Sequence, residues 1–183
     1  MRRIDAGELT LEPQTAAHAD EMFAVLSDPA IYAYENAAPP SPDWLRERYS
    51  RLESRRSADG AEHWLNWVIR IPGPRLAGYV QATVRANGSA AIAYELSSAH
   101  WGRGLARRAV EAMIRELAER YAVVRLFAVA KRRNERSIRF LERLGFSAAE
   151  PDPREDQAIE PDEVLMFRLL DRADRRVTQG PEA

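Results

Sequence analysis

Cysteine is absent from the 183-residue chain, which excludes disulfides, thiol catalysis and cysteine-bound metals. Histidine is scarce, and His18, His63 and His100 show no ligand spacing, so we expect no metal site. No apolar run approaches the roughly 20 residues of a membrane span, and no N-terminal leader with a cleavage site is visible. These absences predict a soluble, cytoplasmic protein without membrane attachment.

The chain also has no large excess of positive or negative charge, because its formal net charge is −1. This balance argues against direct nucleic-acid binding. The distribution is nevertheless uneven, since residues 101–143 carry 12 Lys/Arg and 5 Asp/Glu, whereas residues 150–163 carry seven acids and one arginine. One part of the chain could suit a polyanion and another a cation, although solvated helix faces and an exposed acidic loop would explain the same charges.

Hydrophobic periodicity predicts one α/β (α+β) domain over residues 1–170, followed by a polar C-terminal tail at 171–183. The strands are expected at 8–12, 63–71, 76–85, 90–96, 123–130 and 164–170, with a short one at Phe146. The helices are expected after Thr15, from Ser41, over 105–121 and over 134–144. The run 123–130 is almost wholly apolar and follows a crossover helix, so it should be covered on both faces and parallel to strand 90–96. The sequence therefore predicts a mixed antiparallel and parallel central sheet flanked by helices.

The turn Trp101-Gly102-Arg103-Gly104-Leu105-Ala106 joins strand 90–96 to the next helix. Its two glycines allow a ligand to approach the backbone, and the helix start offers unpaired N–H groups and a positive dipole end. These features suit phosphate, although a plain strand-to-helix turn would use the same glycines. A nucleotide-triphosphatase loop is unsupported because no lysine follows Gly104, and a dinucleotide loop matches only in part because Arg107 occupies its third glycine position.

Four motifs occur together: Tyr94-Glu95-Leu96, the glycine turn, Asn134-x-x-Ser137 and Leu144-Gly145-Phe146. Their order and spacing resemble the GCN5-related N-acetyltransferase (GNAT) superfamily, and within it the branch of ribosomal-protein N-terminal acetyltransferases. The resemblance covers residues 9–170 and is strongest over 91–146. It implies splayed central strands with acetyl-coenzyme A (acetyl-CoA) as cosubstrate, its pantetheine arm filling the gap. It also implies acetyl transfer to a primary amine, which belongs either to a protein or peptide N-terminus or to a small molecule.

Two further expectations accompany this resemblance. A non-catalytic acyl-CoA-binding or regulatory domain is the alternative to an enzyme, and a homodimer is an expectation at the level of the family.

The resemblance also assigns the residues that hold the cosubstrate. Backbone amides of the turn would bind the pyrophosphate, from Gly102, Arg103, Gly104, Leu105 and Ala106. Backbone groups around Leu96 and Ser98 would bond the pantetheine arm, and an amide there would polarise the thioester carbonyl. Asn134 would contact the arm, although an asparagine before a helix is also an ordinary N-cap, and both roles can coexist.

The catalytic candidates are Glu95 and Ser137. An amine must be neutral to attack a thioester, and Glu95 precedes the expected thioester-polarising position on the face opposite Tyr94, so it is the first candidate base. A solvated carboxylate at the strand end, or Glu35 as the base, are the alternatives. The superfamily's usual tyrosine acid is replaced by Leu141, so Ser137 could donate to the sulfur, or it could simply cap its helix.

The acidic segment 150–163 would, by the resemblance, lie beside the amine entrance. The loop with Tyr32, Tyr34 and Glu35 would form the opposite wall. We expect both to attract a cationic amine or peptide N-terminus, chiefly through Asp152, Glu155, Asp156 and Glu160.

Overall fold

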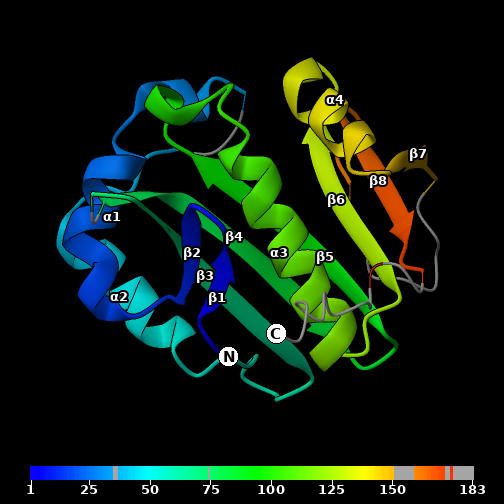
Figure 1. The fold of residues 1–183 in the computed structure, drawn as a ribbon, viewed down its shortest axis with the longest axis horizontal. Helices are drawn as coiled ribbons and strands as arrows, with labels where there is room; N and C mark the ends of the chain where they lie inside the picture. Colours follow the sequence, from blue (N-terminus) through cyan, green and yellow to red (C-terminus); the bar gives the residue numbers. More distant parts are fainter. Residues whose placement is uncertain (35–36, 74, 151–158, 172–173, 175–183) are drawn as a thin grey trace, which may run out of the picture.

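The structure is a computed structural model that describes residues 1–34, 37–73, 75–150, 159–171 and 174. The strands are β1 (Ile4–Ala6), β2 (Leu9–Pro13), β3 (Glu62–Ile71), β4 (Arg75–Arg85), β5 (Ser89–Leu96), β6 (Arg125–Lys131), β7 (Ser147–Ala149) and β8 (Glu163–Leu169). The helices are α1 (Ala19–Leu26), α2 (Pro42–Leu52), α3 (Leu105–Arg120) and α4 (Glu135–Arg143), with short 3₁₀ turns η1 (Ala16–His18), η2 (Pro29–Tyr32) and η3 (Ser98–His100). Within the described residues, the strands form one sheet in the order β1-β2-β3-β4-β5-β6-β8-β7 (Figure 1).

The predicted mixed sheet is confirmed, since β5 and β6 pair in parallel while the other neighbours are antiparallel. The short strand β1 and the three 3₁₀ turns were not predicted, because segments of three or four residues carry no periodicity. The expectation that strand 123–130 is covered on both faces was wrong, because Val129 is 44% exposed. The face of β6 that carries Val129 is covered only in part, since Phe127 on the same face is 7% exposed.

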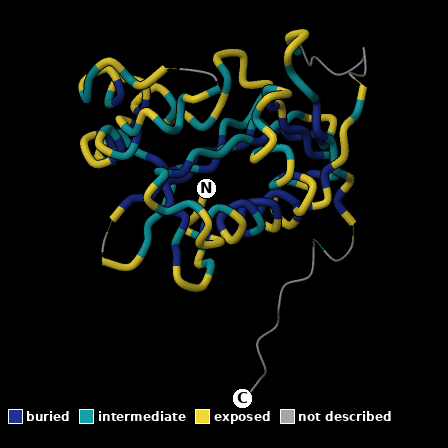
Figure 2. The backbone as a smooth tube through the Cα atoms, turned by 90° about the horizontal axis from the view of Figure 1, so that it is seen from above, coloured by how far each residue is buried: buried dark blue, intermediate teal, exposed yellow. Residues whose placement is uncertain are grey.

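Two hydrophobic clusters lie on opposite faces of the sheet. On one face, Trp67 and Val80 pack with the buried side of α3 and with Leu141 of α4. On the other face, Val68 and Tyr79 pack with α1 and α2. Side chains alternate between faces along each strand, so neighbouring residues such as Trp67 and Val68 separate the two clusters. Figure 2 shows the buried backbone concentrated in the strands and the adjoining helix faces, and the exposed backbone mainly in turns.

One charged residue of α3 departs from the amphipathic pattern. Glu116 carries a charge in the middle of this amphipathic helix, yet it is only 2% exposed. Its carboxylate accepts from Arg2 Nε at 2.8 Å, and Arg120 lies 3.9 Å away. A buried charge needs such a partner, so the N-terminal strand region is tied to α3 by this pair.

The strands β5 and β6 separate towards the end that carries the glycine turn. Their parallel ladder consists of three pairs, Ser89 with Arg125, Ala90 with Leu126 and Ala91 with Phe127. Both strands continue beyond these pairs, β5 to Leu96 and β6 to Lys131. The predicted splay between the central strands is therefore present.

None of the helices in the described residues is long and apolar enough to cross a membrane.

Candidate active site

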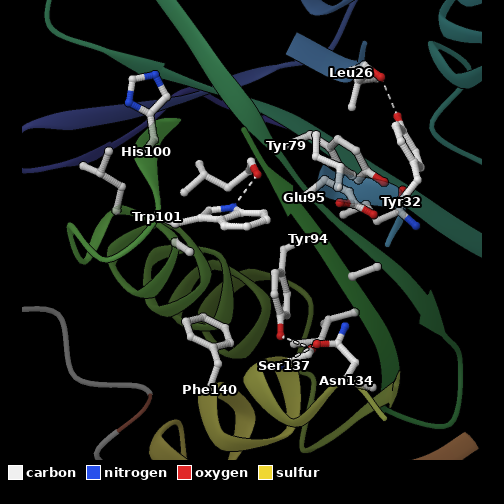
Figure 3. Close-up of a pocket in the computed structure, with 18 of the residues that line it drawn as sticks. Leu26, Tyr32, Tyr79, Tyr94, Glu95, His100, Trp101, Asn134, Ser137 and Phe140 are labelled. Atoms are coloured by element: carbon white, nitrogen blue, oxygen red, sulfur yellow. Dashed lines mark hydrogen bonds between the residues drawn. The ribbon is translucent and has the colours of Figure 1, made fainter. Parts of the chain in front are cut away.

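A cavity of about 960 Å³ opens where β5 and β6 separate. One side of it is formed by the glycine turn, α4 and Tyr94, and the other by α2, η2, Tyr79 and Glu95 (Figure 3). Tyr94 and Glu95 are adjacent in β5 and point to opposite faces of the sheet. Both line the same cavity because the open splay connects the two faces. The volume lies within the range of small-molecule and cofactor sites.

The glycine turn presents bare backbone to the cavity. Gly102 and Gly104 have φ values of 73° and 75°, and a Cβ on either would meet no heavy atom within 4 Å. The first helical hydrogen bond of α3 runs from the Arg108 N–H to the Gly104 oxygen, at 3.1 Å. The amides of residues 105–107 therefore precede the helical ladder, and Gly104 has no side chain to cap them. This arrangement is suited to bind an anion.

The Trp101 side chain closes the turn against β5. Its indole N–H donates to the Leu96 carbonyl at 2.7 Å, and the guanidinium of Arg136 lies 3.3 Å from the ring centroid. The next amide, Ser97 N–H, donates to Ala77 in β4. Because backbone groups alternate sides along a strand, the backbone N–H and carbonyl of Leu96 point away from β4 and towards the splay. The tryptophan thus acts through its side chain as well as through the backbone of the turn.

Tyr94 and Ser137 form a hydroxyl pair on the α4 side of the cavity. Their oxygens are 2.8 Å apart, and the Tyr94 ring packs on Phe140 with centroids 4.8 Å apart. Burial raises the pKa of Tyr94 to about 12, against the opposing effect of the Ser137 hydrogen bond. The Tyr94 hydroxyl therefore stays protonated at neutral pH. The N-cap reading of Asn134 is confirmed, since its Oδ1 accepts from the Ser137 N–H at 3.1 Å.

Glu95 lies among tyrosines on the other side of the cavity (Figure 3). Tyr79 is its direct cross-strand partner, so the two side chains share a face. Tyr32 reaches the same space from η2 and donates its hydroxyl to the Leu26 carbonyl at 2.7 Å. Burial, reinforced by the Glu95 charge, raises the pKa of Tyr32 to about 12 and raises that of Tyr79 further. The carboxylate thus stands beside hydroxyls that stay protonated.

Asp28 fixes the segment that carries Tyr32. Its carboxylate accepts from the Ala30 N–H at 3.0 Å and from the Ser98 N–H at 2.7 Å. Hydrogen bonds from Ser98 hold the pKa of Asp28 below its ordinary value. The carboxylate therefore joins η2 to η3, which follows β5, and the Ser98 amide is committed to Asp28.

Gly78 in β4 allows β5 to approach closely. A Cβ at this position would lie 2.0 Å from the Glu95 carbonyl oxygen and 2.9 Å from the Leu96 Cα. Contacts under 3.0 Å are essentially never seen for real Cβ atoms. Glycine is therefore required opposite Leu96, the residue that follows the candidate base.

The structure brings most of the predicted site residues to this cavity. They are Glu95, Leu96, Gly102, Gly104, Leu105, Ala106, Asn134 and Ser137. Arg103 and Ser98 do not line it; the Arg103 guanidinium lies 3.4 Å from His100 Nδ1. Glu35, Asp152, Glu155 and Asp156 fall outside the described residues. The described end of the acidic segment binds Lys131, with Asp162 at 2.9 Å and Glu163 at 3.0 Å, and contributes nothing to the cavity lining.

Several site residues were missed by the sequence reasoning. Tyr79 and Gly78 owe their importance to the register between β4 and β5, which local periodicity does not reveal. Tyr94 was identified only as a motif residue on the face opposite Glu95. Asp28 was available as a helix-cap candidate before Pro29, but its contact with Ser98 spans 70 residues.

The cavity is suited to bind a coenzyme A thioester. A pyrophosphate requires several N–H donors without an intervening side chain, and residues 102–107 provide open space and a helix N-terminus. Arg107, Arg136 and Arg143 line the same side of the cavity with positive charge. The gap between β5 and β6 leaves strand-edge backbone at Leu96 facing an extended arm. The splayed sheet and this turn are the two features that the resemblance to acetyltransferases predicts.

Comparison with known proteins identifies the family. Residues 8–147 match the model of the Acetyltransferase (GNAT) domain. The chain therefore belongs to the GNAT acetyltransferase family, and it is an N-acetyltransferase. No curated protein matches the chain significantly.

Solved structures share the fold at low identity. A ribosomal-protein-S5-alanine acetyltransferase from Vibrio fischeri is 19% identical, with a TM-score of 0.73 over 93% of this chain and 97% of the other. RimL, a ribosomal L7/L12 α-N-protein acetyltransferase solved with coenzyme A, is 18% identical, with a TM-score of 0.73 over 92% and 98%. A chimera of the spermidine N-acetyltransferase SpeG from Vibrio cholerae with hSSAT is 20% identical, with a TM-score of 0.71 over 89% and 96%. At these identities the likeness establishes the fold alone.

Proposed function

We propose that this protein transfers the acetyl group of acetyl-CoA to a primary amine, in particular to the N-terminal α-amine of a peptide or protein. The observation that carries the proposal is one continuous cavity, which joins the glycine turn on one side of the sheet to Glu95 on the other. A thioester held in the splay would meet an acceptor amine between these two sides. The S5-alanine acetyltransferase and RimL support a protein N-terminus by their fold, whereas the SpeG chimera leaves a small amine as the competing acceptor.

The residues of the glycine turn would hold the cosubstrate. The amides of Gly102, Arg103, Gly104, Leu105 and Ala106 would donate to the pyrophosphate, and Leu96 would offer backbone bonds to the pantetheine arm. The Asn134 oxygen already caps α4, so its amide NH₂ is the group left for the arm. The Ser98 N–H is bonded to Asp28, so any contact with the arm would use another group of Ser98. Acetyl-CoA would supply an acetyl group activated as a thioester.

Glu95 would act as the general base. An α-amine with a pKa near 8 is already neutral in part at pH 7, so it needs only a modest base. The carboxylate of Glu95 would accept the amine proton directly or through one water. Tyr32 and Tyr79 stay protonated beside it, so their hydroxyls would orient the amine by hydrogen bonding.

Ser137 would donate a hydrogen bond to the departing sulfur, and Tyr94 would in turn donate to Ser137. The superfamily's usual tyrosine is replaced by Leu141, which is 1% exposed and packs in the core. Tyr94 brings a phenol from β5 to within 2.8 Å of the Ser137 oxygen. Donation from Tyr94 to Ser137 would leave the serine proton free to bond the sulfur.

An acceptor panel tests this function. The purified protein is incubated with acetyl-CoA and either peptides with free N-termini or small amines, and thiol release and acceptor mass are measured. We expect thiol release to depend on the acceptor, and the acceptor to gain one acetyl group. Tight binding of acetyl-CoA without acceptor-dependent release would instead identify an acyl-CoA-binding domain.

A further inference from the structure

Three amide side chains form a row beneath α2. Gln14 follows β2, and its N–H donates to the Asn66 oxygen at 2.9 Å. Asn66 is the cross-strand partner of Gln81, and Gln81 is the partner of Ala93. Cross-strand partners share a face, so Gln14, Asn66 and Gln81 form an amide row that ends two residues from Glu95. All three line the cavity.

The far end of the amide row is closed and carries unused hydrogen-bonding capacity. Gln14 is 4% exposed, Asn66 6%, and Tyr49 of α2 3%. Within the described part of the chain, neither Gln14 Oε1 nor the Tyr49 hydroxyl has a hydrogen-bond partner. Both residues line the cavity, and burial raises the pKa of Tyr49, an effect that the neighbouring Gln14 side chain opposes. Buried polar atoms without partners are costly, so this end of the cavity favours a hydrogen-bonding group.

The charge of the cavity determines which group fits. Among the described residues that line it, Glu95 is the one carboxylate. Arg48 of α2 lines the same side as the amide row. A second ammonium placed at the row would be desolvated beside a guanidinium and would lack a carboxylate partner among the residues that the structure describes. A neutral donor, such as a carboxamide or a hydroxyl, meets the Gln14 oxygen without this penalty.

The geometry of the sheet sets the length of such an acceptor. The amide row runs from Gln14 next to β3 to Ala93 in β5, across three strand spacings, or about 14 Å. The side chains of Glu95 and Gln14 extend into this space from its two ends. An acceptor that bridges them must therefore be extended over roughly 10 Å between its amine and its neutral group.

We propose that the amide row and Tyr49 form a specificity subsite for a neutral hydrogen-bonding group of the acceptor, remote from the amine that is acetylated. The inference rests on the proposed acetyl transfer at Glu95. In a peptide acceptor the group belongs to the second side chain, because a first side chain such as Gln reaches only about 6 Å from its own α-amine, and a closed recess admits an end group and not a continuing chain. In a small acceptor it is the other end of the molecule.

Four probes with the same length of chain test the end group. They are 6-aminohexanamide, hexylamine, 1,6-diaminohexane and 6-aminohexanoate. We expect kcat/KM to be highest for the amide, by about 5- to 10-fold over hexylamine, the effect of one buried hydrogen bond, and we expect the difference to lie in KM. Matched peptides with Gln, Leu or Lys as the second residue form a second series. A preference for the neutral polar group in either series supports the subsite, and the series that shows it tells whether the acceptor is a small amine or a peptide. Equal use of all end groups in both series overturns the proposal.

Variants at Gln14 and Tyr49 assign the effect to these residues. Both backbone bonds of Gln14, to Asn66 and from Arg55, survive a side-chain change. Gln14→Met and Tyr49→Phe should each reduce the amide-to-hexylamine ratio at least about threefold, and Gln14→Glu should shift the preference towards the diamine. Tyr121→Phe removes a hydroxyl outside the cavity and should keep the wild-type ratio. An unchanged ratio in all three Gln14 and Tyr49 variants would overturn the proposal.

Calorimetry separates failure of the subsite from failure of the proposed function. Binding of the four probes to the coenzyme A complex should follow the same order without turnover. Ordered binding without acetylation would overturn the proposed function and leave the subsite standing. Acetylation of every probe with equal binding would support the proposed function and overturn the subsite.

Discussion

Replacement of Gly78 by alanine is the sharpest structural test of the site. The new Cβ would lie 2.0 Å from the Glu95 carbonyl oxygen, at least 1 Å inside the closest contact that real Cβ atoms make. The nearest atoms are backbone, so the strand itself must move by about 1 Å at Glu95 and Leu96. Overpacking of this kind costs about 1–3 kcal/mol, which lowers Tm by several degrees in a chain of this size. Displacement of the base by about 1 Å should reduce kcat by about 100-fold.

The assay combines thermal unfolding with acceptor-dependent thiol release. Gly60→Ala is the matched control, because Gly60 has a φ of 74° and open space around a Cβ, so the change strains the backbone away from the cavity. We expect Gly60→Ala to lose stability and retain kcat, and Gly78→Ala to lose both. A Gly78→Ala protein with wild-type kcat would refute the claim that this glycine positions Glu95.

Three further predictions follow from the contacts. Tyr94→Phe and Ser137→Ala should each lower kcat at least about 10-fold with little change in the KM for acetyl-CoA, and wild-type kcat in both would remove the hydroxyl pair from the mechanism. The pKa of Asp28 is depressed in the fold, so its stabilisation is present above the unfolded value near 3.8 and is lost as pH falls through the lower folded pKa. Asp28→Asn should therefore unfold at lower urea than wild type at pH 7 and should converge with it in acid, whereas a constant gap would contradict this linkage. Arg2→Gln leaves the buried Glu116 with Arg120, 3.9 Å away, as its ion-pair partner, and because half of the Arg2 side chain is exposed it should cost about 1–2 kcal/mol by denaturant titration. The exposed Arg3→Gln should cost under about 0.5 kcal/mol, and equal effects would exclude a stabilising Arg2–Glu116 pair.

The sequence predicted much of the fold because its periodic segments are long. Helix 105–121 and the strands between residues 63 and 96 were located within one or two residues. The glycine turn was identified because its conformation is a local property of Gly102 and Gly104. The burial of Glu116 was not predictable, since its partner Arg2 lies 114 residues away.

The two sides of the cavity differ in how far the sequence could predict them. Asn134, Ser137 and the turn belong to motifs that are read locally. The acceptor side depends on strand register, which places Tyr79 beside Glu95 and Gln14 beside Asn66. Register is set by long-range pairing, so composition and spacing could not assemble these residues.

The most direct test of acetyl transfer at Glu95 is the pH dependence of acceptor-dependent thiol release in the wild type and in Glu95→Gln. The variant keeps the size of the side chain and removes its basicity. We predict that wild type releases thiol only with an amine present, and that Glu95→Gln is at least about 100-fold slower at pH 7, with a rate that rises as pH approaches the pKa of the amine. Glu95→Gln activity equal to wild type, with the same pH profile, would contradict general-base catalysis by Glu95.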